Sequence, residues 1–344
     1  MTRNHIYSHT SAENALDRRS VEMDFEIERI AELVEGEKAR VIQLQFPEGL
    51  KRYGPDVAKR IRQQIDVTVL LSGNPCYGAC DLDYDGDVDL LVHFGHAEIP
   101  ALAAQKVHFV EVRSDVDVIP VVNEALGLIK GPRVGIVTNV QHVHTLGSVR
   151  GCLESAGLQC SIGSGDGRIK YPGQVLGCNF SSARAVDVDE YLYIGGGAFH
   201  ALGVALATGK RVVAADPFLH RTSIPDADLI VKQRYALITK ALDARTFCIL
   251  AGTKTGQRRL DLAFELVEQA VKRGYDAYTV TINELTPWTL YQFPAEAYVN
   301  TACPRIAIDD ASLFKAPMLT PIEFEMVLGK RDLGEYTLDE LLGG

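Results

Sequence analysis

The chain has 344 residues, of which 47% are hydrophobic and 23% charged, and its formal net charge is −10. This length exceeds one ordinary hydrophobic core and predicts two or three domains of a globular protein. The acidic balance argues against non-specific nucleic-acid binding, which needs a basic surface. No run of about eighteen apolar residues occurs, and the N-terminal segment lacks the apolar core of a secretory signal, so we expect a cytoplasmic protein without a membrane span.

The first predicted unit opens with an amphipathic helix, whose apolar residues recur at the spacing of one helical face: Ile27, Ile30, Ala31 and Val34. Strand-like segments follow at 40–46, 66–73 and 87–96, and a basic helix at 53–65 separates the first two. The continuous apolar residues of 66–73 predict a buried strand.

The same alternation of strand and helix recurs twice. The second pass comprises a strand at 132–140, a helix at 144–157, a short strand at 158–165, a strand, glycine turn and helix within 190–209, and a strand at 211–218. The third comprises a strand within 245–257, a helix at 260–274, a strand at 275–283, and a last strand and loop at 297–309. A short acidic helix is expected at 331–344.

This alternation predicts an α/β fold of three similar units, whose parallel sheets converge with their strand ends on a central site. We expect a first domain with an N-terminal extension at 1–125, a second at 126–237, and a third with the C-terminal tail at 238–344.

Three of the seven cysteines occupy loop-like stretches of their own, each about one domain's length from the next: Cys80, Cys178 and Cys303. Zinc ribbons and ferredoxins place ligands within a few residues of one another, so these three can share a metal only if three units converge. Three thiolates are one short of the usual four for an iron–sulfur cluster and would leave one iron open for substrate. Each of these cysteines by itself is more simply interpreted as a buried thiol, but their matching placement in three units favours ligation of a shared metal.

The other cysteines have plainer interpretations. Cys76 forms the chain's single C-x3-C pair with Cys80, while Cys248 lies in an apolar strand and is expected to be buried. Cys152 and Cys160 flank a helical stretch and are expected to be structural. An odd number of cysteines favours reduced thiols over a disulfide framework.

Polar residues at predicted strand ends are candidates for substrate binding: Glu48, His96, Lys254 and Gln257. Lys254 and Gln257 follow a strand in a loop without phosphate-loop spacing, and they either bind a carboxylate or ribose or begin a solvated helix. Glu48 either orients a ligand or caps the next helix. Alternating burial predicts that His93 is in the core and His96 reaches the site. His142 and His144 lack a partnering carboxylate motif, so no metal is assigned to them.

Several short motifs occur in series between Gln45 and Glu323: QFPEGL, YGACD, LVHFGH, LGCN, GTKTGQ, TACPRIAIDD and KAPMLTPIE. In this order they resemble the archaeal 2-(3-amino-3-carboxypropyl)histidine synthase family, whose members catalyse the first step of diphthamide biosynthesis. The likeness covers almost the whole chain, and several motifs in series are more specific than any one of them.

The resemblance implies a transferase of three α/β domains that acts as a homodimer. Motif by motif, it implies that Cys80, Cys178 and Cys303 ligate a [4Fe–4S] cluster, with Cys76 a bystander. It further implies radical transfer of the 3-amino-3-carboxypropyl group of S-adenosylmethionine to a histidine of elongation factor 2, with electrons from a separate donor.

Two alternatives stay open at this point. A quinolinate-synthase-like dehydratase would also use three α/β units and a three-cysteine cluster, without S-adenosylmethionine. A non-catalytic scaffold subunit would bind the elongation factor, and its cysteines would be structural or would bind zinc.

Overall fold

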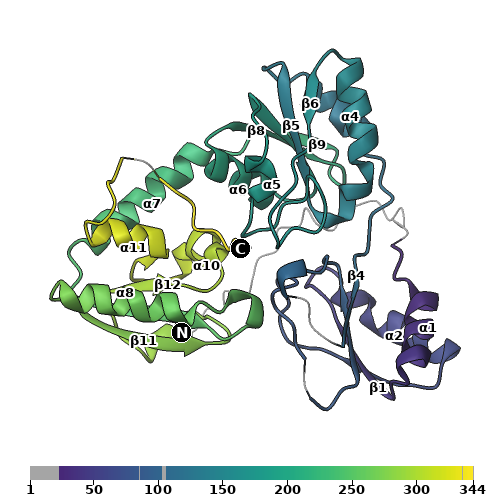
Figure 1. Ribbon diagram of the computed structural model, residues 1–344, viewed down its shortest axis with the longest axis horizontal. Coiled ribbons are helices and arrows are strands. Elements are labelled where there is room, and N and C mark those ends of the chain that lie inside the picture. The colour runs from purple at the N-terminus through teal and green to yellow at the C-terminus, as the bar shows by residue number, and fades with distance from the viewer. Residues whose placement is uncertain (1–22, 85, 103–105, 335, 344) are drawn as a thin grey trace, which may run out of the picture.

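The computed structural model describes residues 23–84, 86–102, 106–334 and 336–343 of the chain. The predicted N-terminal extension up to residue 22 lies outside these residues. Three α/β units, each with its own mainly parallel sheet, surround a common centre (Figure 1). The predicted fold class is confirmed.

The first unit contains a four-stranded parallel sheet in the order β2-β1-β3-β4. Its strands are β1 Val41–Gln45, β2 Thr68–Leu71, β3 Leu90–Phe94 and β4 Val107–Val110. Its helices are α1 Ile27–Glu37 and α2 Gly54–Gln64, with short 3-10 turns at Lys51–Tyr53 and Pro100–Leu102. The four apolar residues of the predicted helical face in α1 are all buried, as expected.

The second unit contains a five-stranded sheet in the order β6-β5-β7-β8-β9, parallel except for the last strand. Its strands are β5 Arg133–Thr138, β6 Gln159–Ser161, β7 Glu190–Ile194, β8 Arg211–Asp216 and β9 Arg221–Ser223. Its helices are α3 Ile119–Leu126, α4 Leu146–Ser155, α5 Ser181–Arg184 and α6 Phe199–Thr208, with a 3-10 segment at Val140–Thr145.

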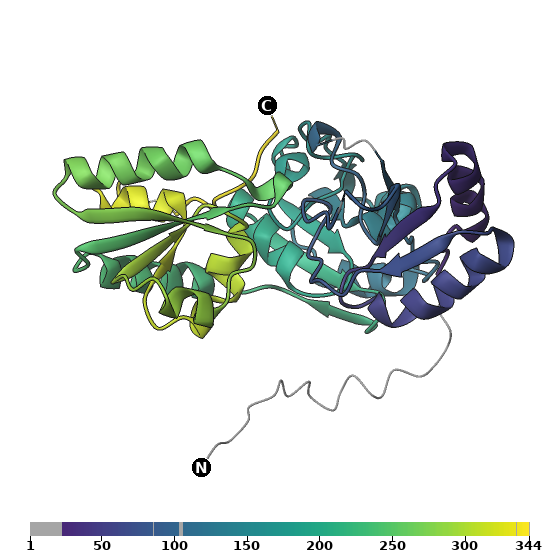
Figure 2. The ribbon, with the colours of Figure 1, turned by 90° about the horizontal axis from the view of Figure 1, so that it is seen from below.

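The third unit contains a parallel sheet in the order β11-β10-β12-β13, and in Figure 2 helices lie above and below its strands. Its strands are β10 Thr246–Gly252, β11 Asp276–Ile282, β12 Ala297–Asn300 and β13 Met318–Leu319. Its helices are α7 Ala227–Ala241, α8 Leu260–Lys272, α9 Pro287–Tyr291, α10 Pro304–Asp309 and α11 Pro321–Val327, with 3-10 turns at Thr255–Gln257 and Ala311–Leu313.

Two local expectations are wrong, and both errors concern tertiary context. Strand β2 is the edge of its sheet, and Leu70 and Leu71 are exposed rather than buried. The acidic segment after residue 330 forms no helix in its described part. Leu338 and Leu341 of this segment are buried against the second unit, and the backbone N–H of Leu341 donates to the carbonyl of Cys178. This hydrogen bond to the second unit takes the place of the bond that the Leu341 N–H would make within a helix.

One predicted domain boundary falls at the end of a helix, and the other falls inside a helix. Helix α3 ends at Leu126, and its apolar face packs into the core of the second unit. The boundary at 237 falls inside α7, whose residues pack against both the second and the third cores. Core packing therefore favours a second unit that begins before α3, while the division into domains stays a prediction.

Candidate metal centre

One cavity of about 1870 Å³ is lined by residues of all three units. In each unit the lining includes residues just beyond the carboxyl ends of strands: His96 follows β3, Asn139 follows β5, and Lys254 follows β10. Parallel α/β sheets place their ligand sites at these ends. The predicted convergence on a central site is therefore observed.

Cys80, Cys178 and Cys303 all line this cavity, each from a different unit. Cys80 lies in the loop between β2 and β3, Cys178 in the loop before α5, and Cys303 at the residue that precedes α10. The first two are buried and Cys303 is half-buried. All seven cysteines of the chain are free. The structure thus brings together the three that sequence spacing singled out.

Burial and mutual proximity keep these thiols protonated in the absence of a metal. Burial raises the pKa of Cys178 well above its usual value, and Cys80 and Cys303 raise it further. Burial also raises the pKa of Cys303 to about 12, with a smaller contribution from Cys80. A metal that binds such sulfurs must displace their protons and supply the compensating positive charge.

Cys80 is enclosed by segments of the other two units. The backbone N–H of Gly256 donates to its carbonyl at 3.3 Å, and Gln257 Nε2 donates to its Sγ at 3.4 Å. A Cβ on Gly256 would lie 2.3 Å from Cys80 Cβ, so only glycine permits this approach. Arg168 of the second unit donates from Nη2 to the Gly256 carbonyl at 3.1 Å.

Arg168 provides a test of whether the cavity fits an anionic metal group. Its side chain is only 7% exposed, and its Nε has no hydrogen-bond partner within the described residues. Its charge favours the thiolate forms of both Cys80 and Cys178. A buried cation with an unsatisfied donor requires an anion nearby. Three thiolates that bind an iron–sulfur cluster meet this requirement, so the residues present fit the group.

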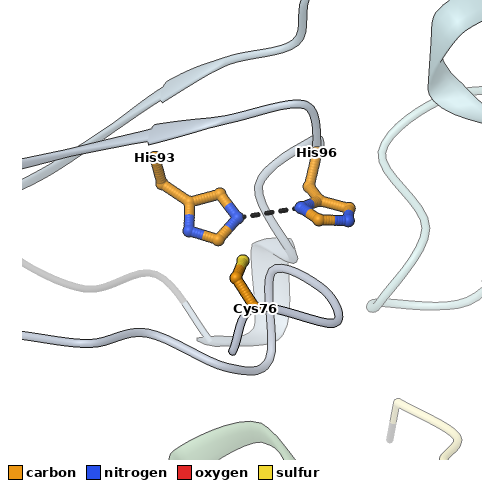
Figure 3. A group of neighbouring side chains, drawn as sticks. All are labelled: Cys76, His93 and His96. Atoms are coloured by element: carbon orange, nitrogen blue, oxygen red, sulfur yellow. Dashed lines mark hydrogen bonds between the residues drawn. The ribbon is translucent and has the colours of Figure 1, made fainter. Parts of the chain in front are cut away.

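A second cluster of metal-binding side chain types lies beside the cavity and is drawn in Figure 3. Among the residues that the structure describes, the group whose ligand atoms all lie within 4.8 Å of one another is Cys76, His93 and His96. The three cavity cysteines form no such group within the described residues, so they are spread more widely than the ligands of a single ion. A multi-iron cluster binds its cysteines through different irons and tolerates this spread.

Hydrogen bonds explain the histidine pair without a metal. Gln45 Nε2 donates to the Asp81 carbonyl at 2.7 Å, which leaves Gln45 Oε1 to accept from His93 Nδ1 at 2.8 Å. His93 Nε2 then accepts from His96 Nδ1 at 3.0 Å (Figure 3). Burial lowers the pKa of His96 to about 4, so the ring is neutral and its Nε2 remains an acceptor. His96 lines the cavity, whereas His93 is in the core, as predicted.

The other predicted binding residues divide between the cavity and the surface. Lys254 and Gln257 line the cavity, and Lys254 Nζ forms ion pairs with Asp81 at 2.8 Å and with Glu284. Glu48 is not among the lining residues, and its exposed carboxylate pairs with Lys51.

The environments of His142, His144 and Cys248 differ, and of these only Cys248, expected in a buried strand, matches a specific expectation. His142 is buried with neither ring nitrogen hydrogen-bonded, His144 is exposed, and neither belongs to a metal-binding group within the described residues. Cys248 is fully buried on β10.

Small residues beside two of the cysteines serve protein packing. The small size of Gly177 and Ala302, next to Cys178 and Cys303, would suit the approach of a bulky cluster. A Cβ on Gly177 would instead lie 2.9 Å from Cδ of Arg305, and one on Gly252 would meet Cβ of Ala302 at 2.9 Å. Gly177 therefore admits the Arg305 side chain, whose guanidinium lies 3.9 Å from the centroid of the Phe199 ring.

Sequence reasoning missed Arg168 and the C-terminal segment. Arg168 lies in SGDGRIK, which has no recognisable motif, and its only signal was a basic residue in a glycine-rich loop. The C-terminal segment looked like a short acidic helix, and the leucines beside acidic residues in TLDELL were the available sign of burial.

Fold and cavity together define an α/β protein with a candidate metal centre at the junction of three units. The chain belongs to the family described as putative diphthamide synthesis protein, whose family model matches residues 46–337. No helix within the described residues has the length and apolar character that crossing a bilayer requires.

Curated relatives are similar in sequence to this chain over most of their length. The chain is 40% identical to 2-(3-amino-3-carboxypropyl)histidine synthase of Pyrococcus horikoshii over 312 residues, which cover 89% of this chain and 90% of that protein. It is 31% identical to subunit 1 of the synthase of Schizosaccharomyces pombe, with 87% of this chain and 72% of that protein covered. The crystal structure of Dph2 from P. horikoshii with a 4Fe-4S cluster superposes with a TM-score of 0.86 at 37% identity, covering 94% of this chain and 96% of that one.

Proposed function

We propose that this protein transfers the 3-amino-3-carboxypropyl group of S-adenosylmethionine to a histidine of elongation factor 2, the first step of diphthamide biosynthesis. The transfer is radical, and the cofactor is a [4Fe–4S] cluster held by Cys80, Cys178 and Cys303. The observation that carries the proposal is the placement of these cysteines, one from each unit, in a single cavity. A similar protein that has been crystallised with a 4Fe-4S cluster supports it.

When bound, such a cluster supplies one electron and an iron without a protein ligand, on which a substrate can dock. The chain supplies enclosure and orientation. At about 1870 Å³ the cavity exceeds the roughly 300–1,000 Å³ of a pocket for one small molecule. The space accommodates a cluster, a nucleoside-sized substrate and an incoming side chain together.

We assign a substrate contact to one lining residue, His96, and a structural role to another, Lys254. His96 Nε2 is an acceptor and can receive an N–H of a substrate ammonium or imidazole group. Lys254 lies with its ammonium 5.3 Å from the centroid of the Tyr77 ring and between two carboxylates, so it orders this wall of the cavity rather than offering a free charge. Glu48, which is not among the lining residues, is left without a role.

The proposal includes elongation factor 2 as protein substrate, a second copy of the chain in a homodimer, and a separate electron donor in the cytoplasm. Seven free cysteines agree with a reducing compartment.

The direct experiment is anaerobic purification, reduction with dithionite, and addition of S-adenosylmethionine with elongation factor 2. We expect methylthioadenosine in solution and a mass increase on one histidine of the factor. Quinolinate formation instead would identify the dehydratase, and bound zinc without iron or sulfide would identify the scaffold. Either result would refute the proposal.

Cysteine substitutions test the ligands one at a time. Cys80→Ala, Cys178→Ala and Cys303→Ala should each abolish the cluster absorbance or the transfer. Cys248→Ala is the matched control, because that thiol is also free and buried but lies in the core of the third sheet. Full activity in any one of the three ligand variants would overturn the assignment.

A further inference from the structure

We infer that Arg168 and Gln257 are positioning residues that set the reduction potential of the cluster through the Cys80 sulfur. The inference rests on the proposed function only in that Cys80 binds the cluster. The two residues come from the second and third units, whereas Cys80 comes from the first. The potential would thus be set where all three units meet.

The contact of Gln257 is direct. Its Nε2 lies 3.4 Å from Cys80 Sγ, within the range of hydrogen bonds to sulfur, and the Gln257 residue is only 6% exposed. A thiolate bound to iron has no proton to donate, so the amide can interact with it only as a donor. Hydrogen bonds to cluster sulfurs stabilise the more negative, reduced state and raise the potential.

Arg168 places a positive charge beside the residues that form this hydrogen bond. No carboxylate of the described residues lies within ion-pair distance of its guanidinium, although the side chain is almost fully buried. Its Nε is unsatisfied, and its Nη2 is anchored on the Gly256 carbonyl, next to Gln257 in the chain. A buried positive charge that has no counter-ion among the described residues favours negative charge nearby, which is the reduced state of the cluster.

Hydrogen bonds hold Arg168, Gln257 and Cys80 in fixed positions relative to one another. Gly256 donates its N–H to the Cys80 carbonyl and accepts from Arg168, so one residue joins both partners. The N–H of Arg168 donates to Asp166, whose carboxylate also accepts from Asn179, the neighbour of Cys178. Packing therefore fixes the donor geometry before any cluster binds, which limits reorganisation on reduction.

The test is redox titration of the loaded protein, monitored by paramagnetic resonance without S-adenosylmethionine. Gln257→Leu and Arg168→Met should each lower the ratio of reduced to oxidised cluster at fixed potential about tenfold, a shift of about 59 mV for a one-electron couple. Arg168→Lys keeps the charge and should restore most of the potential. Gln269→Leu, on helix α8 with its side chain hydrogen-bonded to the surface residues Glu265 and Lys330, is the matched control and should not change it.

The outcomes distinguish a failure of this inference from a failure of the proposed function. Unchanged potentials in Gln257→Leu and Arg168→Met, at iron and sulfide contents equal to those of the unsubstituted protein, would overturn the inference. If either variant does not load, Gln257→Glu, which has the same shape, and Arg168→Gln, which removes the charge but keeps a polar side chain, supply the measurement. Both are expected to lower the potential. Failure of the unsubstituted protein to bind any cluster would instead refute the proposed function.

Discussion

Arg259 and Asp339 form a bidentate ion pair, with Nη1 2.9 Å from Oδ1 and Nη2 2.6 Å from Oδ2. The same guanidinium donates to the carbonyls of Thr301 and Ala302, next to Cys303. Two residues beyond Asp339, the N–H of Leu341 donates to the carbonyl of Cys178. The C-terminal segment therefore ties together the loops that carry two of the three cavity cysteines.

Asp339→Asn should loosen both loops and speed the loss of iron. The amide keeps the shape of the side chain but removes the charge that holds Arg259, and bidentate arginine–carboxylate pairs are among the stronger protein hydrogen bonds. We expect iron release to a chelator several times faster than from the unsubstituted protein, measured by absorbance under anaerobic conditions. Glu268→Gln, which breaks the exposed pair with Lys272, is the control and should leave the rate unchanged.

Gly256→Ala should disrupt the cavity without unfolding the chain. The added methyl group would lie 2.6 Å from the Cys80 Cα, so one of the two loops must move. We expect reduced cluster content with little change in the melting temperature. Gly151→Ala is the matched control, because nothing lies within 4 Å of its added methyl group in α4, and it should stabilise the helix by about 0.5–1 kcal/mol. Normal loading of Gly256→Ala would show that Cys80 does not depend on this approach.

Glu323→Gln should lower the free energy of unfolding and should not affect the chemistry of the site. Glu323 pairs with Arg234, the side chains being 0% and 2% exposed, and it forms a capping box with Thr320 at the start of α11. Removal of one partner of a buried ion pair leaves the other charge uncompensated, at a cost of about 3–5 kcal/mol. Denaturant unfolding measures this loss, and Arg331→Gln, at an exposed pair with Glu325, is the control. A change below about 1 kcal/mol would contradict the structure at this point.

Acid should destabilise the metal-free protein between about pH 6.5 and pH 4. Burial lowers the pKa of His96, His142 and His200 to about 4 each, from an ordinary value of 6.5. The unfolded chain then binds protons that the folded chain does not, so the free energy of unfolding falls as pH falls through this interval, by about 3 kcal/mol for each histidine.

Urea unfolding at several pH values measures this slope. His200→Gln should make it shallower, because one group no longer titrates differently in the two states. A slope unaffected by His200→Gln would show that this ring is not buried neutral.

Local pattern predicted the elements that carry the cavity. The apolar spacing of α1 and the alternation of strand and helix depend on neighbours along the chain, so they are readable without a structure. The last residue of the KAPMLTPIE motif is a different case. Glu323 looked like part of a functional signature, but its carboxylate pairs with Arg234 and caps helix α11.

The sequence by itself determined three α/β units and the three cysteines that they would have to bring together. Only the tertiary structure decided that Gln257 contacts Cys80, that Arg168 contacts the neighbouring Gly256, and that the C-terminal segment lies beside Cys178. These partners are distant in the chain, and their contacts depend on the packing of whole units. Local propensity and periodicity record which face of an element is apolar, but not which other unit will cover it.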